Sequence, residues 1–348
     1  MKRHALTSLK RFSTFAVEAG AGAVVELESA ADVEEVQFRA DQDLLLGGGS
    51  NILCAADIPG TAYLVRIPGR RILRREADTA LVEAGAGEDW HQLVLWSLEQ
   101  GLSGLENLSL IPGRVGAAPI QNIGAYGVEL AETLESVTAW DLHERRWLRF
   151  ENAACRFGYR DSCFKAGWPD RYLITGVTLR LSDRFVPRLA YAGLREELTR
   201  QGIADPDARQ VSEAVVRLRR RKLPDPAELG NAGSFFKNPV VGRDQAENLL
   251  LRFPGLPVYP LSAEAAKLGA AWMIEHCGWR GYRQGDAGVA KRHALVLVNH
   301  GHASGRELLQ LAGRVRDSVR DAFGVELEPE PRIIWPAAIE AGKRWSQE

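Results

Sequence analysis

The 348-residue sequence predicts an α+β protein that folds as two or three domains in one chain. Strands and amphipathic helices alternate through residues 23–181, whereas residues 244–334 are expected to form two helices, a strand, a long helix and a last strand. Between these parts, the basic helix end RLRRRKLPDP at residues 217–226 stops at Pro224. We therefore expect a domain boundary there.

Periodicity predicts the elements of the first part. Ser29 and Asp32 have the spacing of a capping box, which begins a helix that runs to about Ala40. A second helix, residues 88–100, has its apolar side chains on one face and Gly101 directly after its end. The predicted strands are residues 23–27, 44–46, 81–84, 134–141, 146–150 and 172–181.

The second part is predicted to contain three helices and two strands. The helices are residues 244–252, 263–276 and 304–323, and Gly324 closes the third. The strands are residues 294–298 and 325–334, and the second of these contains Glu330.

Charge and composition exclude several classes of protein. The formal net charge is −1, so no basic field draws the chain to nucleic acid or to a membrane, and we expect neither as a partner. The N-terminus MKRHALTSLKRF has no apolar stretch after its basic residues, which predicts a cytoplasmic protein without a signal peptide. Four cysteines without a CxxC pair and seven histidines without metal-ligand spacing predict reduced thiols and no metal site. We expect a monomer.

Two glycine-rich segments are candidates for ligand binding. Gly47-Gly48-Gly49-Ser50-Asn51 follows a buried strand, and its backbone N–H groups could hold a diphosphate; a tight turn between strands fits equally well. The segment is neither GxGxxG nor GxxxxGK[ST], which disfavours a Rossmann or P-loop site. The second segment, residues 107–130, leaves little bulk above its backbone, and Gln121 and Asn122 offer donors and acceptors for the edge of a ring. A long structural loop is the alternative.

Three separated side chains could supply an acid–base and charge-stabilising set. Arg160 in FGYRD is a fixed cation, Ser234 in GNAGSFFKNP is a hydroxyl donor, and Glu330 in LEPEPR is a carboxylate. Each also has an ordinary structural interpretation. Arg160 could pair with Asp161, Ser234 could be a turn serine, and Glu330 could be a solvated edge residue.

The order of several long strings resembles the family of UDP-N-acetylenolpyruvoylglucosamine reductase, a flavoenzyme of peptidoglycan precursor synthesis. The strings are LLLGGGSNIL, GLENLSLIPGRVGAAPIQNIGAYGVEL, CRFGYRDSCFK, KLPDP, GNAGSFFKNPVV and LEPEPR, and together they extend from residue 44 to residue 332. Tyr191 in LAYAGL is similar to the tyrosine-bearing loop of the longer form of the family.

The resemblance implies a fold of the vanillyl-alcohol-oxidase type. Two α/β subdomains, residues 1–70 and 71–222, would bind noncovalent FAD. An α+β domain, residues 223–325, would bind substrate, and a C-terminal strand and tail, residues 326–348, would contain Glu330.

The resemblance also implies roles for individual residues. Arg160 and Glu330 would stabilise an enol or enolate, and Ser234 would protonate it. Substrate would be bound by Tyr191, Lys222, Asn238 and His293. FAD would be bound by Gly47, Gly48, Gly49, Ser50, Asn51, Ile111, Pro112, Gly113, Gly116, Ala117, Ala118, Ile120, Gln121, Asn122, Gly124, Ala125, Tyr126, Gly127 and Arg160. The family often has serines where this chain has Ala117 and Ala118, so hydroxyl contacts to the flavin would be missing at these positions.

The implied reaction is reduction of an enolpyruvyl ether on UDP-N-acetylglucosamine to UDP-N-acetylmuramate. NADPH would reduce FAD, hydride would reach C3 of the double bond, and Ser234 would protonate C2. An ionised Glu330 would repel the developing charge, so we expect it to be protonated or hydrogen-bonded to substrate. Two other functions remain open: a flavin oxidase of the same fold, and a nucleotide-sugar binding protein that has lost turnover. Rapid reduction of the flavin by NADPH would argue against the oxidase.

Overall fold

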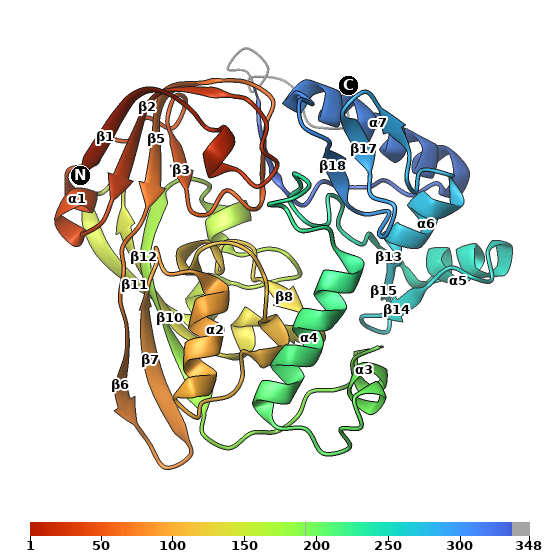
Figure 1. Ribbon diagram of the computed structural model, residues 1–348, viewed down its shortest axis with the longest axis horizontal. Helices are drawn as coiled ribbons and strands as arrows, with labels where there is room; N and C mark the ends of the chain where they lie inside the picture. Colours follow the sequence, from red (N-terminus) through yellow and green to blue (C-terminus); the bar gives the residue numbers. More distant parts are fainter. Residues whose placement is uncertain (192, 336–348) are drawn as a thin grey trace. The chain divides into compact units, whose positions relative to one another are not determined.

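The computed structural model describes residues 1–191 and 193–335, so the end of the predicted C-terminal tail, residues 336–348, lies outside the described residues. The chain forms two compact units (Figure 1). Unit 1 comprises Met1–Thr7, Ala21–Gly48 and Ile58–Arg221, and unit 2 comprises Ser8–Gly20, Gly49–Asp57 and Lys222–Glu348. Among the described helices, none is long and apolar enough to cross a membrane.

The described residues of unit 1 form a four-stranded sheet, a five-stranded sheet and a two-stranded hairpin. The first has the strand order β1-β2-β5-β3, and β5 pairs in parallel with both β2 and β3. The second has the order β11-β10-β12-β7-β6 and is antiparallel throughout. The strands are β1 (Lys2–Ser8), β2 (Gly20–Leu27), β3 (Leu44–Leu46), β5 (Ile58–Val65), β6 (Arg70–Arg75), β7 (Thr79–Gly85), β10 (Leu134–Asp141), β11 (Arg146–Glu151) and β12 (Tyr172–Ser182). A short hairpin joins β8 (Gly124–Ala125) to β9 (Val128–Glu129).

Four helices belong to this part of the chain. Helix α2 (Trp90–Glu99) buries Trp90, Leu93 and Val94 in one core with the buried residues of β7 and β12. Helices α3 (Leu194–Arg200) and α4 (Ala208–Lys222) share a second core with Tyr126. Helix α1 (Ala30–Glu34) begins at the capping box of Ser29 and Asp32. Single helical turns of unit 1 occur at Glu106–Leu108, Val115–Ala117, Leu130–Glu132, Asn152–Cys155 and Cys163–Gly167. A further turn, Lys10–Phe12, belongs to unit 2.

The described residues of unit 2 form three helices and three small sheets around one apolar core. The helices are α5 (Arg243–Arg252), α6 (Ala270–His276) and α7 (Gly305–Phe323). The sheets have the orders β13-β15-β14, β16-β17-β18 and β19-β4. Their strands are β4 (Ile52–Cys54), β13 (Val240–Gly242), β14 (Val258–Pro260), β15 (Ala265–Leu268), β16 (Arg283–Gln284), β17 (Ala287–Val289), β18 (Leu297–Asn299) and β19 (Arg332–Ile334).

Elements with strong end signals agree closely with the sequence prediction. Strand β3 has the predicted bounds, and α2 and α5 differ from their predictions by at most two residues at each end. Helix α7 begins after its Ser304 N-cap and ends at Gly324, which has a φ of 67°. Asp89 caps α2 and Ser304 caps α7, and these caps agree with the apolar periodicity of the two helices, which is why their prediction succeeds.

Four predicted elements are wrong in extent or type. The helix predicted to end near Ala40 stops at Glu34. The helix predicted at residues 263–276 is β15 followed by α6, because Ala266 and Leu268 alternate with more exposed neighbours in the manner of a strand. The strand predicted at 294–298 begins later, at Leu297, after a turn in which the N–H of Val296 donates to the carbonyl of His293. The strand predicted at 325–334 is restricted to β19, since Pro329 and Pro331 have no N–H for a ladder.

Asn299 joins distant backbone segments inside unit 2. Its Nδ2 donates to the carbonyl oxygens of Phe15 and Ala16 at 3.1 and 3.2 Å. Its Oδ1 accepts from the N–H groups of Gly301 and Ala303, both at 2.9 Å. The side chain is 3% exposed, so water cannot replace these bonds if the amide is removed.

We therefore expect Asn299→Ala to lower the free energy of unfolding of this unit by about 2–3 kcal/mol, since several buried polar groups lose their partner. Urea unfolding followed by fluorescence measures the loss. The matched control is Asn248→Ala, an exposed position on α5, which should change stability by less than about 0.5 kcal/mol. Equal losses in the two variants would show that Asn299 has no such linking role.

Candidate active site

Two glycine-rich segments meet by direct backbone contact within unit 1. A Cβ on Gly48 would lie 2.9 Å from the Cα of Gly113, and a Cβ on Gly116 would lie 2.5 Å from the Cβ of Ala86. The N–H of Gly116 donates to the carbonyl of Ala86 at 2.9 Å. A side chain at either position would collide with these neighbours, so glycine is required at Gly48 and Gly116 for the segments to pack this closely.

The second half of the predicted diphosphate loop belongs to unit 2. Gly49 has a φ of 62°, and a Cβ there would collide with the carbonyl oxygen of Phe12. Asn51 is anchored by the N–H of Arg332, which donates to its carbonyl at 3.0 Å, and its own Nδ2 donates to the carbonyl of Glu330 at 3.4 Å. The loop therefore follows a path that requires glycine at residue 49 and ends beside the Glu330 segment.

Asn122 is held inside the protein by both ends of its amide. Its Nδ2 donates to Glu129 Oε2 at 2.8 Å and to the carbonyl of Gly158 at 3.2 Å, and its Oδ1 accepts from the N–H of Ala131 at 3.0 Å. The side chain is 1% exposed. Asn122 therefore positions the loop that contains Arg160, which is a different role from the predicted contact with a ring edge. Ala118 is also buried, within the core of the second sheet.

Arg160 lies in a left-handed backbone conformation, with a φ of 55°. Its Nη2 donates to the carbonyl of Gly124 at 2.6 Å, and the guanidinium lies 5.4 Å from the ring centroid of Tyr159. Gly158 and Asp161 pair across the turn, and Lys165 Nζ donates to the carbonyl of Arg160 at 3.2 Å. The guanidinium is thus fixed against the glycine-rich segment that the sequence predicts to bind flavin.

Arg219 is a further candidate that sequence analysis missed. Its Nε donates to the carbonyl of Leu110 at 3.2 Å, and among the described residues no carboxylate lies within ion-pair distance of it. Burial lowers the pKa of Arg219, and the positive charge of Arg160 lowers this pKa further. From the sequence, we interpreted RLRRRK only as a basic helix end. However, Arg219 follows Val211 by eight residues and Val215 by four, which places it beside the buried stripe of α4.

Two tyrosines accompany these arginines in unit 1. The rings of Tyr126 and Tyr191 pack edge to face with 4.9 Å between their centroids. Burial raises the pKa of Tyr126 to about 12, so its hydroxyl remains a neutral donor. Tyr191, the predicted substrate residue, is 43% exposed. The predicted flavin segment, Arg160 and the tyrosine loop therefore converge within one unit.

Ser234 and Glu330 are brought together in unit 2. The N–H of Glu330 donates to the carbonyl of Phe235 at 2.7 Å, and the N–H of Lys237 donates to the carbonyl of Glu328 at 2.9 Å. The N–H of Phe235 in turn donates to the carbonyl of Leu295 at 2.7 Å. The Ser234 hydroxyl, at an incompletely buried position, has no hydrogen-bond partner among the described residues. It is therefore available to a ligand.

Two further predicted substrate residues, Asn238 and His293, lie near this segment. Asn238 follows Ser234 by four residues, and His293 bonds to Leu295, whose carbonyl accepts from the N–H of Phe235. Asn238 Oδ1 accepts from the N–H of Ala270 at 3.0 Å, which leaves its amide N–H groups as donors. His293 Nδ1 accepts from the N–H of Leu295 at 3.3 Å. Burial lowers the pKa of His293, and the charges of Lys222 and Arg280 lower this pKa further. His293 is thus held neutral with its proton on Nε2.

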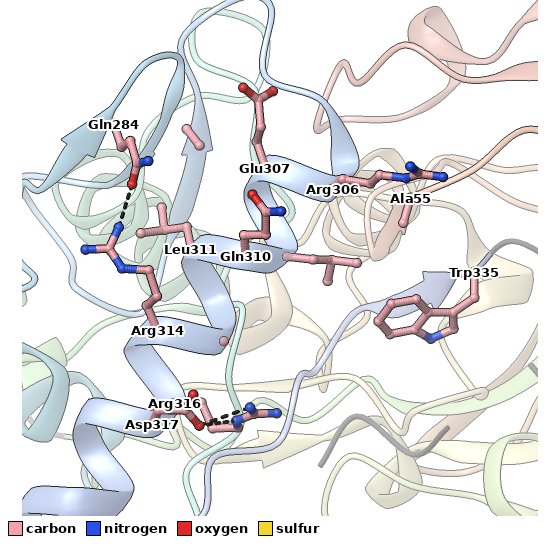
Figure 2. Close-up of a pocket in the computed structure, with 13 residues that line it drawn as sticks. Ala55, Gln284, Arg306, Glu307, Gln310, Leu311, Arg314, Arg316, Asp317 and Trp335 are labelled. Carbon is pink, nitrogen blue, oxygen red and sulfur yellow. Dashed lines mark hydrogen bonds and ion pairs between the residues drawn. The ribbon is translucent and has the colours of Figure 1, made fainter. Parts of the chain in front are cut away.

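A cavity of about 660 Å³ on α7 is unrelated to these residues. Figure 2 shows Arg306, Gln310 and Arg314 of α7 around it, with Trp335 on the opposite side. Its lining includes none of the predicted site residues. Arg314 donates to Gln284, and Arg316 pairs with Asp317 at 3.0 Å, so these two cations already have partners within the protein. We do not assign the chemistry to this cavity.

Comparison with known proteins decides the family. The C-terminal domain model of UDP-N-acetylenolpyruvoylglucosamine reductase matches residues 225–334, and an FAD binding domain model matches residues 21–145. The chain is 51% identical over 330 residues to the UDP-N-acetylenolpyruvoylglucosamine reductase of Pseudomonas aeruginosa, with 94% of this chain and 97% of that protein covered. It is 51% identical over 339 residues to the same reductase of Xanthomonas oryzae pv. oryzae, with 96% and 99% covered.

The chain belongs to the UDP-N-acetylenolpyruvoylglucosamine reductase family. A solved reductase of this family, from Thermus caldophilus, superposes with a TM-score of 0.64 and 26% identity, covering 96% of this chain and 98% of that one. The predicted family and fold class are confirmed, and so is FAD as the cofactor of an oxidoreductase. The roles of the individual site residues in this reductase remain predictions.

The neutral state of His293 predicts a pH dependence of stability. The pKa of His293 in the folded protein lies below the ordinary value of 6.5, so the unfolded chain binds the proton more readily. The contribution of His293 to stability is complete above about pH 6.5 and is lost as the pH falls toward its folded pKa. We expect wild-type protein to lose more unfolding free energy between about pH 7 and pH 5 than His293→Asn, whose Oδ1 can still accept from Leu295.

Urea unfolding at several pH values measures this difference. His143→Asn is the matched control, because the His143 side chain is 81% exposed, and its profile should follow wild type. If His293→Asn and wild type have parallel profiles between pH 7 and pH 5, His293 is not held neutral by its surroundings.

Proposed function

We propose that this chain reduces the enolpyruvyl double bond of UDP-N-acetyl-3-O-(1-carboxyvinyl)-glucosamine to give UDP-N-acetylmuramate, a cytoplasmic step of peptidoglycan precursor synthesis. The main structural support is the hydrogen bond between Glu330 and Phe235, which sets Glu330 beside a Ser234 hydroxyl that has no partner among the described residues. Family membership supports the reaction class. Bound FAD, reduced by NADPH, would supply the hydride.

The arginines of unit 1 would stabilise negative charge on the substrate. Reduction at C3 places charge at C2 and on the adjacent carboxylate, and a guanidinium stays protonated in this environment. Arg160 is fixed by the carbonyl of Gly124, and Arg219 is a second cation close enough to alter its electrostatics. We assign both to the carboxylate and the developing enolate. Asn122 would act on the reaction indirectly, by holding the Gly158 end of the Arg160 loop.

Ser234 would donate the proton to C2. A hydroxyl is a weak acid, but a carbanion is a very strong base, so the transfer is favourable once the hydroxyl is positioned. Ser234 is positioned by the next two residues, Phe235 and Phe236, which are 0% and 1% exposed and pack in the core. Glu330 would be protonated or hydrogen-bonded to substrate, because an ionised carboxylate would oppose the charge that Arg160 stabilises.

The remaining substrate residues would bind the nucleotide end. Lys222 can pair with the diphosphate, and Tyr191 offers a hydroxyl and an exposed ring. Asn238 keeps its amide donors, and neutral His293 keeps a donor on Nε2, because a backbone N–H already occupies Nδ1. Such donors suit the phosphate, ribose and uracil oxygens of a UDP-sugar.

Ser234→Ala should separate the two half-reactions. Reduction of FAD by NADPH needs no proton from Ser234, so flavin bleaching should be close to normal. Reoxidation by the enolpyruvyl substrate should slow by about 10²–10⁴-fold, the usual cost of removing a positioned general acid. Ser234→Cys should recover part of the rate, because a thiol can donate. Stopped-flow absorbance under anaerobic conditions measures both steps.

Ser262→Ala is the matched control in unit 2, because the Ser262 hydroxyl lies in an exposed turn and accepts from the N–H groups of Glu264 and Ala265. Both half-reactions should be normal in this variant. Near wild-type reoxidation in Ser234→Ala would exclude Ser234 as the proton donor, and equal slowing of both steps would indicate a structural role.

A further inference from the structure

Two arginines lie on either side of the Gly47–Gly48 turn within unit 1. Arg66 directly follows β5, and its Nη1 donates to the carbonyl of Gly47 at 2.8 Å. Arg114 directly follows Gly113, and its Nη1 donates to the carbonyl of Gly87 at 3.0 Å. A Cβ on Gly47 would lie 3.6 Å from the Cβ of Arg114, so the stem of Arg114 packs against the same turn that Arg66 holds.

Neither arginine forms an ion pair with a described residue. Among residues 1–191 and 193–335, no carboxylate lies within ion-pair distance of Arg66 or Arg114. This differs from Arg171, which lies 2.8 Å from Asp141, and from Arg180, which lies 2.9 Å from Glu135. Arg66 donates to the carbonyls of Gly47 and Val65, and Arg114 donates to that of Gly87, so each guanidinium keeps further N–H donors out of its five.

The charge of Arg114 acts on Arg66. Burial lowers the pKa of Arg66, the charge of Arg114 lowers this pKa further, and the charge of Glu26 raises it. Two half-buried like charges beside one turn destabilise the protein unless an anion lies with them. The turn between them presents backbone without a side chain, because a Cβ on Gly48 would collide with the backbone of Gly113.

We propose that Arg66 and Arg114 form a two-arginine site at the Gly47–Gly48 turn for the diphosphate of FAD. FAD is favoured over the other diphosphates of the reaction because the FAD binding domain match, residues 21–145, includes the turn and both arginines. The diphosphate carries the two negative charges that the pair lacks, and guanidinium N–H groups bind phosphate oxygens well. The proposal rests on FAD as the cofactor, and the identity of the reduced substrate does not enter it.

In this proposal, Arg114 also compensates for Ala117 and Ala118, which stand where the family often has serines. These residues have no hydroxyl for the cofactor, and Ala118 is buried in the core. Arg114 lies three residues before Ala117 and contributes a charged donor to the same segment. A charged donor would replace the hydroxyl contacts with a stronger interaction that depends on salt.

The test measures cofactor affinity directly. FAD release on dilution of the holoenzyme, and rebinding of FAD to the released protein, are followed by flavin fluorescence for wild type, Arg66→Met, Arg114→Met and the double variant. We expect each single variant to weaken FAD binding about 10–100-fold, the effect of losing one charged hydrogen-bonding group. Binding of riboflavin, which has no diphosphate, should be unchanged. The salt dependence of FAD binding should be smaller in both single variants.

Arg71→Met is the matched control, because Arg71 is an exposed arginine of β6 that pairs with Glu83 at 2.8 Å. It should bind FAD as wild type does. Arg66→Met also removes the bond to Gly47, so its melting temperature is compared with wild type, and Arg114→Met decides the question if Arg66→Met does not fold. Arg114→Lys should recover part of the affinity.

Three results would overturn the proposal. The first is unchanged FAD affinity in Arg114→Met. The second is an equal loss of riboflavin and FAD affinity, which would mean that the arginines only support the turn. The third is unchanged FAD affinity with weaker binding of UDP or NADP⁺ to the holoenzyme, which would assign the site to another diphosphate. Failure of the enolpyruvyl reaction with normal FAD binding would contradict the proposed function and leave the FAD site unaffected.

Discussion

The backbone of Phe235 is the connection on which the chemistry of unit 2 depends. Its N–H donates to Leu295 and its carbonyl accepts from Glu330, so one buried residue joins segments that are far apart in the sequence. Its ring is 0% exposed and packs edge to face against Phe15 and Phe236. Because the ring cannot move without opening the core, the neighbouring Ser234 and the facing Glu330 have fixed backbone positions. A weak acid such as serine needs this kind of positioning to act.

Three arginines of unit 1 carry positive charge without an ion pair to a described residue. The chain as a whole is almost neutral, with a formal charge of −1. Even so, Arg66, Arg114 and Arg219 have no carboxylate within ion-pair distance among the described residues, and each donates to a backbone carbonyl instead. Burial lowers the pKa of Arg66 and of Arg219. Anionic ligands would favour the charged form of both, and FAD and an enolpyruvyl UDP-sugar are both anionic.

Features set by neighbouring residues could be predicted from the sequence, whereas contacts between distant segments could not. Helix α7 was predictable because Ser304, Glu307 and Gly324 specify its ends within the helix itself. The family strings identified Arg160, Ser234 and Glu330 as candidates, but not the Phe235 contact that sets two of them side by side. Arg219 was missed because it lies in a run of basic residues, and the sequence alone did not distinguish the one that lies beside the buried face of α4. Asn122 was predicted as a ligand contact, and only the fold reveals that Glu129, Gly158 and Ala131 use its amide.

The measurement that tests this account most directly is the visible spectrum of the purified protein under anaerobic conditions. The account predicts a flavin band that NADPH bleaches and that the enolpyruvyl UDP-sugar restores, with one UDP-N-acetylmuramate formed per flavin reoxidised. If only oxygen restores the band and no UDP-N-acetylmuramate forms, the chain is not an enolpyruvyl reductase.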